Sequence, residues 1–148
     1  MRIGICGTGN MGSAIAERLL GENHHVSVWN RTWEKTKPLL NLGAAFATSP
    51  QSLVAGCDII ISMVIDDEAV LSLYQNDDGL LSADLKDKLI IEMSTILPET
   101  SKHIDRQIRL NGGNYIECPV GGSVQPALRG ELLGLVGGDV ENIDKARP

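Results

Sequence analysis

The chain has 148 residues, of which 43% are apolar and 22% charged, a balance typical of one folded globular domain. Its net charge of −6 argues against a nucleic-acid-binding surface, because phosphate recognition needs clustered Lys and Arg side chains. No apolar run approaches the length of a membrane span. We therefore predict a single domain, residues 1–148, that binds neither nucleic acid nor membrane.

Three cysteines, Cys6, Cys57 and Cys118, lie far apart in the sequence, each in or beside an apolar run. An odd number of cysteines without metal-ligand spacing is typical of reduced, buried thiols. We therefore predict that all three pack in the core, that the chain has no metal site, and that the protein is cytoplasmic. The apolar run at the N-terminus is shorter than that of a signal peptide and is predicted as a first strand.

Short apolar runs alternate with helical patterns along the chain. Strands are predicted at residues 3–6, 26–29, 44–46, 58–64, 88–93, 114–118 and 132–136, the last ended by Gly137-Gly138. Helices are predicted at residues 11–21, around 33–43, from Pro50, from Asp66, and from Pro98 to Leu110. The run at 58–64 is almost unbroken, which indicates burial on both faces of a parallel sheet. The alternation predicts a doubly wound α/β fold, a mostly parallel Rossmann sheet with helices on both faces.

A glycine-rich stretch, Gly7-Thr8-Gly9-Asn10-Met11-Gly12, follows the first predicted strand and precedes the first predicted helix. In its pattern G-x-G-x-x-G, the first glycine permits a tight turn, the second lets a diphosphate approach the backbone, and the third lets helix and strand pack closely. The helix N-terminus then presents free N–H groups to the phosphates. We predict a dinucleotide-binding turn, the alternative being a glycine turn with a structural role alone.

The end of the second predicted strand carries Asn30-Arg31-Thr32. Proteins that bind NAD place an Asp or Glu here, which binds the 2′-hydroxyl of the ribose. A carboxylate would repel a 2′-phosphate, whereas the Arg31 guanidinium can pair with it and Asn30 and Thr32 can donate hydrogen bonds. We therefore predict NADP as the cofactor in preference to NAD. The alternative is that Arg31 is a solvated side chain at the start of a helix.

Five motifs follow one another along the chain. They are the glycine stretch, Asn30-Arg31-Thr32, Ile61-Ser62-Met63-Val64, Glu92-Met93-Ser94-Thr95 with Pro98, and Pro119-Val120-Gly121-Gly122 continuing to Gly130-Glu131-Leu132 and Val136-Gly137-Gly138. In this order they resemble the N-terminal domain of the β-hydroxyacid dehydrogenase family, which includes 3-hydroxyisobutyrate dehydrogenase, tartronate semialdehyde (glyoxylate) reductases and 6-phosphogluconate dehydrogenase. The resemblance covers essentially the whole chain. It implies an oxidoreductase that transfers a hydride between a nicotinamide cofactor and a small hydroxy acid or its semialdehyde.

The resemblance also implies roles for single residues. Met63 and Val64 would lie against the cofactor, Thr95 would reach its nicotinamide ribose, and Gly121–Ser123 with Ser94 would bind the substrate. These segments follow the carboxyl ends of predicted strands, where open α/β sheets bind ligands. One alternative is that Met63 and Val64 belong to the core. Another is that Ser94 and Thr95 cap the helix that begins at Pro98.

The chain departs from the family pattern in two places. The family usually has Ser where this chain has Gly121, and a hydroxyl follows two residues later at Ser123. Either Ser123 takes the role of that Ser or the substrate is held differently; we favour Ser123. Second, the catalytic Lys of the family lies in an all-helical C-terminal domain, whereas this chain stops at Arg147-Pro148. We therefore expect the chain alone to bind nucleotide with little or no turnover, and to self-associate through the surface that such a domain would cover.

Two other functions fit the same residues. One is a stand-alone nucleotide-binding or sensor module, which would follow if the reading frame ended at Pro148. The other keeps the enzyme class and changes the substrate to an imine, as in the imine reductases that share this fold and loop. The part of the protein beyond this domain would distinguish between these functions.

Overall fold

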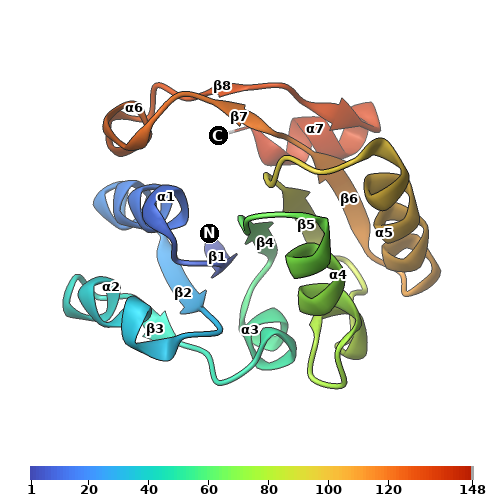
Figure 1. The fold of residues 1–148 in the computed structure, drawn as a ribbon, viewed down its shortest axis with the longest axis horizontal. Helices are drawn as coiled ribbons and strands as arrows, with labels where there is room; N and C mark the ends of the chain where they lie inside the picture. The colour runs from blue at the N-terminus through green and yellow to red at the C-terminus, as the bar shows by residue number, and fades with distance from the viewer. Residues whose placement is uncertain (148) are drawn as a thin grey trace.

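The computed structural model describes residues 1–147, and a seven-stranded sheet runs through its middle (Figure 1). The strand order is β3-β2-β1-β4-β5-β6-β9. The strands are β1 Arg2–Cys6, β2 His25–Trp29, β3 Ala45–Phe46, β4 Ile59–Ser62, β5 Leu89–Glu92, β6 Asn114–Glu117 and β9 Gly137–Gly138. All neighbours pair in parallel except β9, which is antiparallel to β6. The predicted doubly wound, mostly parallel sheet is confirmed. Pro148, where we expect a connection to a further domain, lies outside the described residues.

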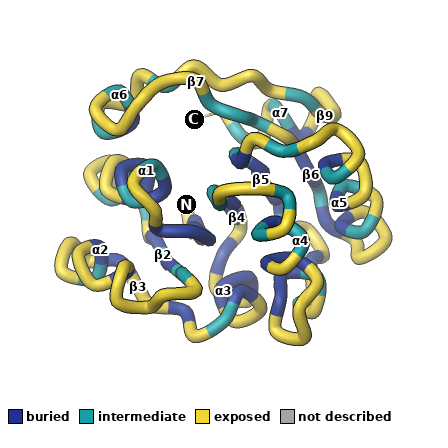
Figure 2. Tube along the Cα trace, in the orientation of Figure 1, coloured by how far each residue is buried: buried dark blue, intermediate teal, exposed yellow. Residues whose placement is uncertain are grey.

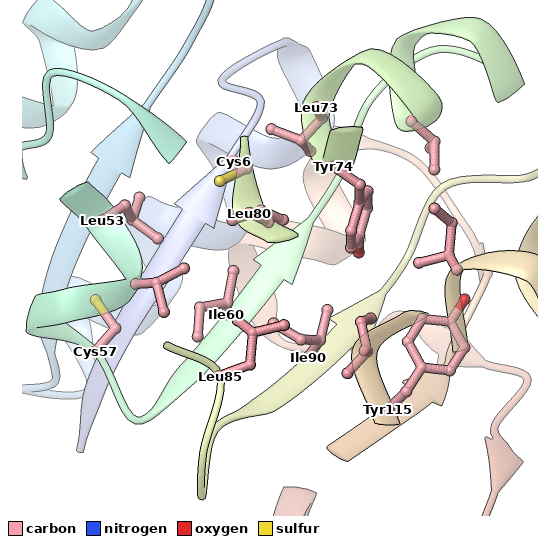
Figure 3. Close-up of a cluster of buried hydrophobic side chains, with 14 of the residues drawn as sticks. Cys6, Leu53, Cys57, Ile60, Leu73, Tyr74, Leu80, Leu85, Ile90 and Tyr115 are labelled. Atoms are coloured by element: carbon pink, nitrogen blue, oxygen red, sulfur yellow. The ribbon is translucent and has the colours of Figure 1, made fainter. Parts of the chain in front are cut away.

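Helices cover both faces of this sheet. One face carries α3 (Pro50–Gly56), α4 (Asp67–Gln75), α5 (Pro98–Leu110) and the 3-10 turn η2 (Leu80–Ser82), and the other carries α1 (Asn10–Gly21), α2 (Lys37–Asn41), α6 (Val124–Arg129) and α7 (Val140–Ala146). Successive side chains of a strand point to opposite faces. Ile60 therefore packs in the first cluster, shown in Figure 3, and Ile59 and Ile61 pack in the second. All four residues of β4 are buried, as the apolar run predicts (Figure 2).

The helices on the first face begin where the sequence predicts. The Ser49 hydroxyl accepts a hydrogen bond from the backbone of Ser52 at 3.0 Å in a capping box, with Pro50 in the first turn of α3. The Asp66 carboxylate caps α4 by accepting from the backbone N–H of Ala69 at 2.8 Å. In α5, which begins at Pro98 as predicted, Ile104 and Ile108 lie four residues apart and are both fully buried. The capping residues and prolines in the sequence therefore predict correctly where these helices begin.

The strand predicted at residues 132–136 is shorter than predicted and does not belong to the main sheet. Leu133–Gly134 (β8) instead pairs antiparallel with Val120–Gly121 (β7) in a separate two-stranded sheet. The apolar pattern suggests a buried strand, but Leu133 and Leu135 are 67% and 66% exposed. An apolar run on the surface has the same types of residue as a buried strand, so hydrophobic periodicity cannot distinguish the two.

The glycine pair predicted to end that strand is itself the seventh strand of the main sheet. Glycine fits there because β9 approaches β6 closely: a Cβ at Gly138 would lie 2.9 Å from the Ile116 side chain, and one at Gly137 would lie 2.8 Å from Glu117. Gly138 also has a positive φ of 148°, which L side chains rarely adopt. The pair therefore closes the edge of the sheet instead of marking a turn.

The remaining differences concern short elements and one thiol. The helix predicted around residues 33–43 divides into a 3-10 turn, η1 (Trp33–Thr36), and α2, and the helices α6 and α7 were not predicted from the sequence. Cys6 and Cys57 are buried as predicted, but Cys118 is partly exposed, so the prediction of core packing is wrong for that thiol. Among residues 1–147, no helix combines the length and apolar character needed to cross a membrane.

Candidate functional site

The site lies at the carboxyl ends of β1 and β4, the neighbouring strands where the order of the sheet reverses. From β1 the chain goes on to β2 and β3 on one side, and from β4 it goes on to β5 and β6 on the other. The two strand ends are joined where the backbone N–H of Met63 donates to the carbonyl of Cys6 at 2.9 Å. Open α/β sheets bind ligands in the crevice at such a switch point. The glycine stretch follows β1 and the Met63-Val64 segment follows β4.

Two glycines of the stretch are required by the fold itself. Gly7 has a φ of +98°, and a Cβ there would overlap the carbonyl of Met63. A Cβ at Gly12 would overlap the carbonyl of Gly7, because the first turn of α1 packs directly on the loop. Both positions therefore need glycine for close packing of β1, α1 and the β4 loop, as the G-x-G-x-x-G pattern predicts.

The second glycine of the pattern, Gly9, is different. It is exposed, and a Cβ there would meet no atom of the protein within 4 Å. Its backbone is extended (φ −69°, ψ −173°), a conformation open to any residue, and it caps α1 without any side-chain hydrogen bond. The first turn of α1 has no acidic residue. The free N–H groups and open space at this helix N-terminus therefore fit a phosphate group approaching the backbone.

The hydroxyl group of Thr8, the second residue of the stretch, faces inward. Thr8 is buried, and its hydroxyl is one of two buried side-chain oxygens that lack a hydrogen-bond partner in the described part of the chain. The Ser13 hydroxyl donates to the Thr8 carbonyl at 3.1 Å. Asn10 is exposed and Met11 is half-buried at the start of α1. The loop is therefore anchored by the buried Thr8 and by the Ser13 hydrogen bond, while Gly9 and Asn10 are exposed to solvent.

Asn30 holds the glycine stretch to the end of β2. Its side-chain oxygen accepts a hydrogen bond from the backbone N–H of Thr8 at 3.0 Å, and its side-chain nitrogen donates to the carbonyl of Thr32 at 2.9 Å. We predicted Asn30 as a hydrogen-bond donor to a phosphate, but in the structure its oxygen and one of its N–H bonds are used within the protein. Asn30 thus fixes the relative position of the two segments predicted to bind the cofactor.

Arg31 and Thr32 lie beside this contact with exposed side chains. Within residues 1–147, Arg31 makes no ion pair and no side-chain hydrogen bond, so its guanidinium is available to an external anion. Two tryptophans bracket the segment: Trp29 is half-buried at the end of β2, and Trp33 is 49% exposed at the start of η1. The Lys37 ammonium lies 4.2 Å from the centroid of the Trp33 ring, a cation–π contact.

The segments after β4 and β5 are joined by a hydrogen bond. The backbone N–H of Val64 donates to the Ser94 hydroxyl at 2.9 Å. Met63 and Val64 are half-buried, and Val64 packs against the first core cluster. Ser94 is buried and Thr95 is exposed. The Ser94 hydroxyl, predicted to bind substrate, therefore contacts the β4 loop in this structure. Helix α5 is capped by Leu97 without a side-chain bond, so the alternative that Ser94 or Thr95 caps it is wrong.

Next to these two segments lies a buried carboxyl group that was not predicted from the sequence. Glu92, the last residue of β5, is fully buried. One carboxylate oxygen accepts from the Tyr74 hydroxyl at 2.9 Å and the other accepts from the backbone N–H of Ser94 at 2.9 Å. Burial raises the pKa of Glu92, and the hydrogen bonds from Ser94 and Tyr74 oppose this rise. The available signal was a single acidic residue inside the apolar run at 88–93.

Replacing Glu92 with glutamine is expected to change how stability depends on pH. The raised pKa means that the folded protein holds this proton more strongly than the unfolded chain, whose ordinary value is 4.5. The carboxyl group therefore lowers stability as the pH rises from about 4.5 to the folded pKa. The groups that face Glu92, namely Tyr74, Tyr115 and Cys6, also have raised pKa values and stay protonated across this interval.

Urea unfolding of the wild type and Glu92→Gln at a series of pH values measures this effect. The free energy of unfolding of Glu92→Gln minus that of the wild type should increase as the pH rises. This difference should become constant once the carboxyl group of the folded wild type is ionised. Because the remaining carboxylates are the same in both proteins, their contributions cancel in the difference. A difference that does not vary with pH would contradict the raised pKa.

The third predicted segment, Gly121–Ser123, stands apart from these hydrogen bonds. Gly121 belongs to β7, and Gly122 has a φ of +139° and faces Leu132 so closely that a Cβ would lie 2.7 Å from its side chain. Ser123 precedes α6 and its exposed side chain caps no backbone group. In Figure 1, α6 lies next to α1, and β7 and β8 pass along the same edge of the molecule. No hydrogen bond within residues 1–147 joins this segment to the glycine stretch or to Ser94.

Comparison with known proteins identifies the family of the chain. Residues 2–148 match the family described as the NAD binding domain of 6-phosphogluconate dehydrogenase. The chain belongs to this family. The predicted Rossmann fold, the binding of a nicotinamide cofactor and the resemblance to the hydroxyacid dehydrogenases are therefore confirmed at the level of the family. None of the residues in 1–147 form a group of three or more His, Cys, Asp or Glu side chains suited to a metal ion.

Three similar proteins illustrate the range of the family. The chain is 37% identical over 148 residues to glyoxylate/succinic semialdehyde reductase 1 of Arabidopsis thaliana. This match covers 100% of this chain and 51% of the relative. It is 39% identical over 138 residues to the cytokine-like nuclear factor N-PAC of Danio rerio, covering 93% of this chain and 30% of the relative. Among solved structures, Psf3 in complex with NADP+ and 2-OPP has a TM-score of 0.93 at 36% identity, covering 99% of this chain and 52% of the other. This NAD binding domain therefore spans about half or less of each similar protein.

Proposed function

We propose that this chain is the NADP-binding part of an oxidoreductase that transfers a hydride between the nicotinamide and a small hydroxy acid or its semialdehyde. The observation that carries the proposal is Gly9, a glycine that the protein itself does not require, at an uncapped helix N-terminus beside the switch point of the sheet. The likeness to a glyoxylate/succinic semialdehyde reductase supports the class of substrate. The likeness to a structure that contains NADP+ supports the cofactor.

In this proposal each segment of the site has one task. The glycine stretch, with Thr8, Asn10 and Met11, would seat the diphosphate on the N-terminus of α1, and Arg31 with Thr32 would bind the 2′-phosphate of the adenosine. Met63, Val64 and Thr95 would lie along the nicotinamide half, and Gly121–Ser123 would contact the substrate. The nicotinamide, when bound, supplies or accepts the hydride.

The role of this chain is then to bind and orient the cofactor. None of its residues is assigned to move the proton of the reaction, and we propose that this group comes from a part of the protein beyond residue 148. Ser123, at the exposed start of α6, is the residue of this chain that we propose nearest to the substrate. Its hydroxyl can donate or accept a hydrogen bond at a carboxylate or carbonyl oxygen.

Replacing Arg31 with alanine is expected to weaken NADP binding about tenfold or more and to leave NAD binding nearly unchanged. A charge-assisted contact with the 2′-phosphate contributes roughly 1.5–3 kcal/mol, and NAD lacks that phosphate. Calorimetric titration of both cofactors measures the two affinities. Because the Arg31 side chain has no ion pair or hydrogen bond within residues 1–147, its removal should not disturb the fold.

A matched control is Lys35→Ala, which removes another exposed cation, in η1, from the same region. It should leave both affinities nearly unchanged, whereas a general loss of positive potential would make both variants weaken NADP alike. Tighter binding of NAD than of NADP by the wild type, or an equal loss of both cofactors in Arg31→Ala, would refute the proposed preference.

A second candidate is a nucleotide-binding module that catalyses no reaction. It is favoured by the 39% identity to a protein named as a nuclear factor. Cofactor binding alone cannot separate the two candidates, because both predict it. Hydride transfer by the full-length protein, measured with glyoxylate, succinic semialdehyde and a cyclic imine as substrates, distinguishes them and also tests for an imine reductase.

A further inference from the structure

Three hydrogen bonds link the loops after β4 and β5 to one buried carboxyl group. The Tyr74 hydroxyl and the backbone N–H of Ser94 donate to the two oxygens of Glu92, and the Ser94 hydroxyl in turn accepts from the backbone N–H of Val64, each at 2.9 Å. Tyr74 and Glu92 are fully buried and Ser94 is 3% exposed. The carboxyl group is therefore connected through Ser94 to the half-buried Val64 of the β4 loop, while the Tyr74 hydroxyl binds its other oxygen from helix α4.

We propose that Glu92 is a positioning residue for the nicotinamide half of the cofactor site. It holds the Val64 and Ser94-Thr95 segments in one arrangement by fixing the backbone of Ser94, whose hydroxyl fixes the backbone of Val64. This inference rests on the proposed function, because it assumes that these two segments face the nicotinamide. Glu92 itself touches no reacting group, so its effect is exerted entirely through Ser94.

The chemistry of the position supports a role beyond packing. Burying a carboxyl group is costly, and an apolar side chain of similar volume often stabilises a core as well or better. Leu89 and Ile90, earlier in the same strand, are apolar and buried, so β5 does not need a polar residue to form. A carboxylate has two acceptor oxygens and no donor. It can therefore accept one hydrogen bond from the Tyr74 hydroxyl of α4 and another from the Ser94 N–H after β5. Departures from the simple pattern of a buried strand are expected at functional sites.

A second contact of the same kind lies on the other side of the switch point. Asn30 joins Thr8 to Thr32, and it therefore orders the segments assigned to the diphosphate and the adenosine. No hydrogen bond within residues 1–147 connects the Asn30 contacts with the Glu92 contacts. The side-chain hydrogen bonds that order each half are thus separate, although the backbones of the two halves meet where Met63 donates to Cys6. Loss of one set of side-chain bonds is therefore expected to leave the other half able to bind its part of the cofactor.

The experiment compares NADP with 2′,5′-ADP, which carries the adenosine half alone, in calorimetric titrations. Glu92→Met removes both acceptor oxygens, and Ser94→Ala removes only the acceptor for Val64. Both variants are expected to weaken NADP about tenfold while changing 2′,5′-ADP by less than about twofold. Glu92→Gln keeps an oxygen for the Ser94 N–H and should recover most of the NADP affinity.

Tyr74→Phe is the matched control, because it removes a buried hydroxyl from the same carboxylate but leaves the bond to Ser94 intact. It should bind both ligands as the wild type does. Should Glu92→Met fail to fold, Ser94→Ala and Glu92→Gln still decide the question. If the wild type binds neither ligand, the proposed function fails and this inference with it. If the wild type binds both but Ser94→Ala weakens neither or weakens both alike, the inference alone is overturned.

Discussion

An alanine at position 9 is expected to lower the affinity for NADP about tenfold to a hundredfold and to leave the free energy of unfolding within about 0.5 kcal/mol of the wild type. The methyl group would project into open space, where no atom of the protein lies within 4 Å, and the extended backbone of Gly9 accepts it without strain. Any loss of affinity therefore reports a group that approaches from outside the protein.

The control for this variant is alanine at position 12. There the methyl group would overlap the carbonyl of Gly7, so Gly12→Ala should destabilise the fold by about 1–3 kcal/mol or more and weaken binding as a consequence. Chemical denaturation and calorimetry of the two variants separate a role in binding from a role in packing. If Gly9→Ala binds NADP as the wild type does, the diphosphate does not seat on this helix N-terminus.

Exchanging Asn30 for aspartate is expected to reverse the cofactor preference. The new carboxylate would repel the 2′-phosphate, weakening NADP at least about tenfold, and would accept a hydrogen bond from the ribose hydroxyl of NAD, strengthening it about threefold to tenfold. The Thr8 N–H keeps its acceptor, since the aspartate oxygen replaces the amide oxygen that now accepts it at 3.0 Å. The bond to Thr32 is lost, because the carboxylate has no N–H to donate.

Asn30→Ala serves as the control, because it removes both hydrogen bonds without adding a charge. It should weaken NAD and NADP alike by loosening the glycine stretch from the end of β2. Titrating both cofactors against both variants gives four affinities, and the sign of the NAD change in Asn30→Asp is the decisive one. If Asn30→Asp weakens NAD as much as NADP, the position only holds the loop and does not select the cofactor.

The parts of the fold that the sequence predicted correctly are those specified by local pattern. The run of β4 is buried on both faces, Ile104 and Ile108 recur at helical spacing on α5, and Ser49-Pro50 opens α3. Two glycines of the dinucleotide-binding pattern are explained by contacts within the protein, and the third by the absence of any. Periodicity, capping residues and backbone freedom are properties of neighbouring residues, and one sequence is enough to recognise them.

The parts that could not be predicted depend on contacts between distant residues. Asn30 reaches Thr8 across 22 positions, and Ser94 reaches Val64 across 30. Nothing near either residue in the sequence indicates these partners. The surface run at Leu133–Val136 carries the same apolar letters as a buried strand, and only its place against β7 shows that it lies outside the sheet. The segments proposed to form the site could therefore be named from the sequence, whereas the hydrogen bonds that hold them in place could not.

The two tryptophans give this chain a built-in optical probe. The sequence contains no others, and Trp29 and Trp33 flank Asn30-Arg31-Thr32 on either side. An indole that is partly open to water, with an ammonium group above its ring, emits according to the charge and solvation of its surroundings, so filling the adenosine side should alter the ultraviolet emission of the unlabelled protein. Occupancy can then be followed in real time, at concentrations too low for calorimetry, without introducing a dye near the residues under test.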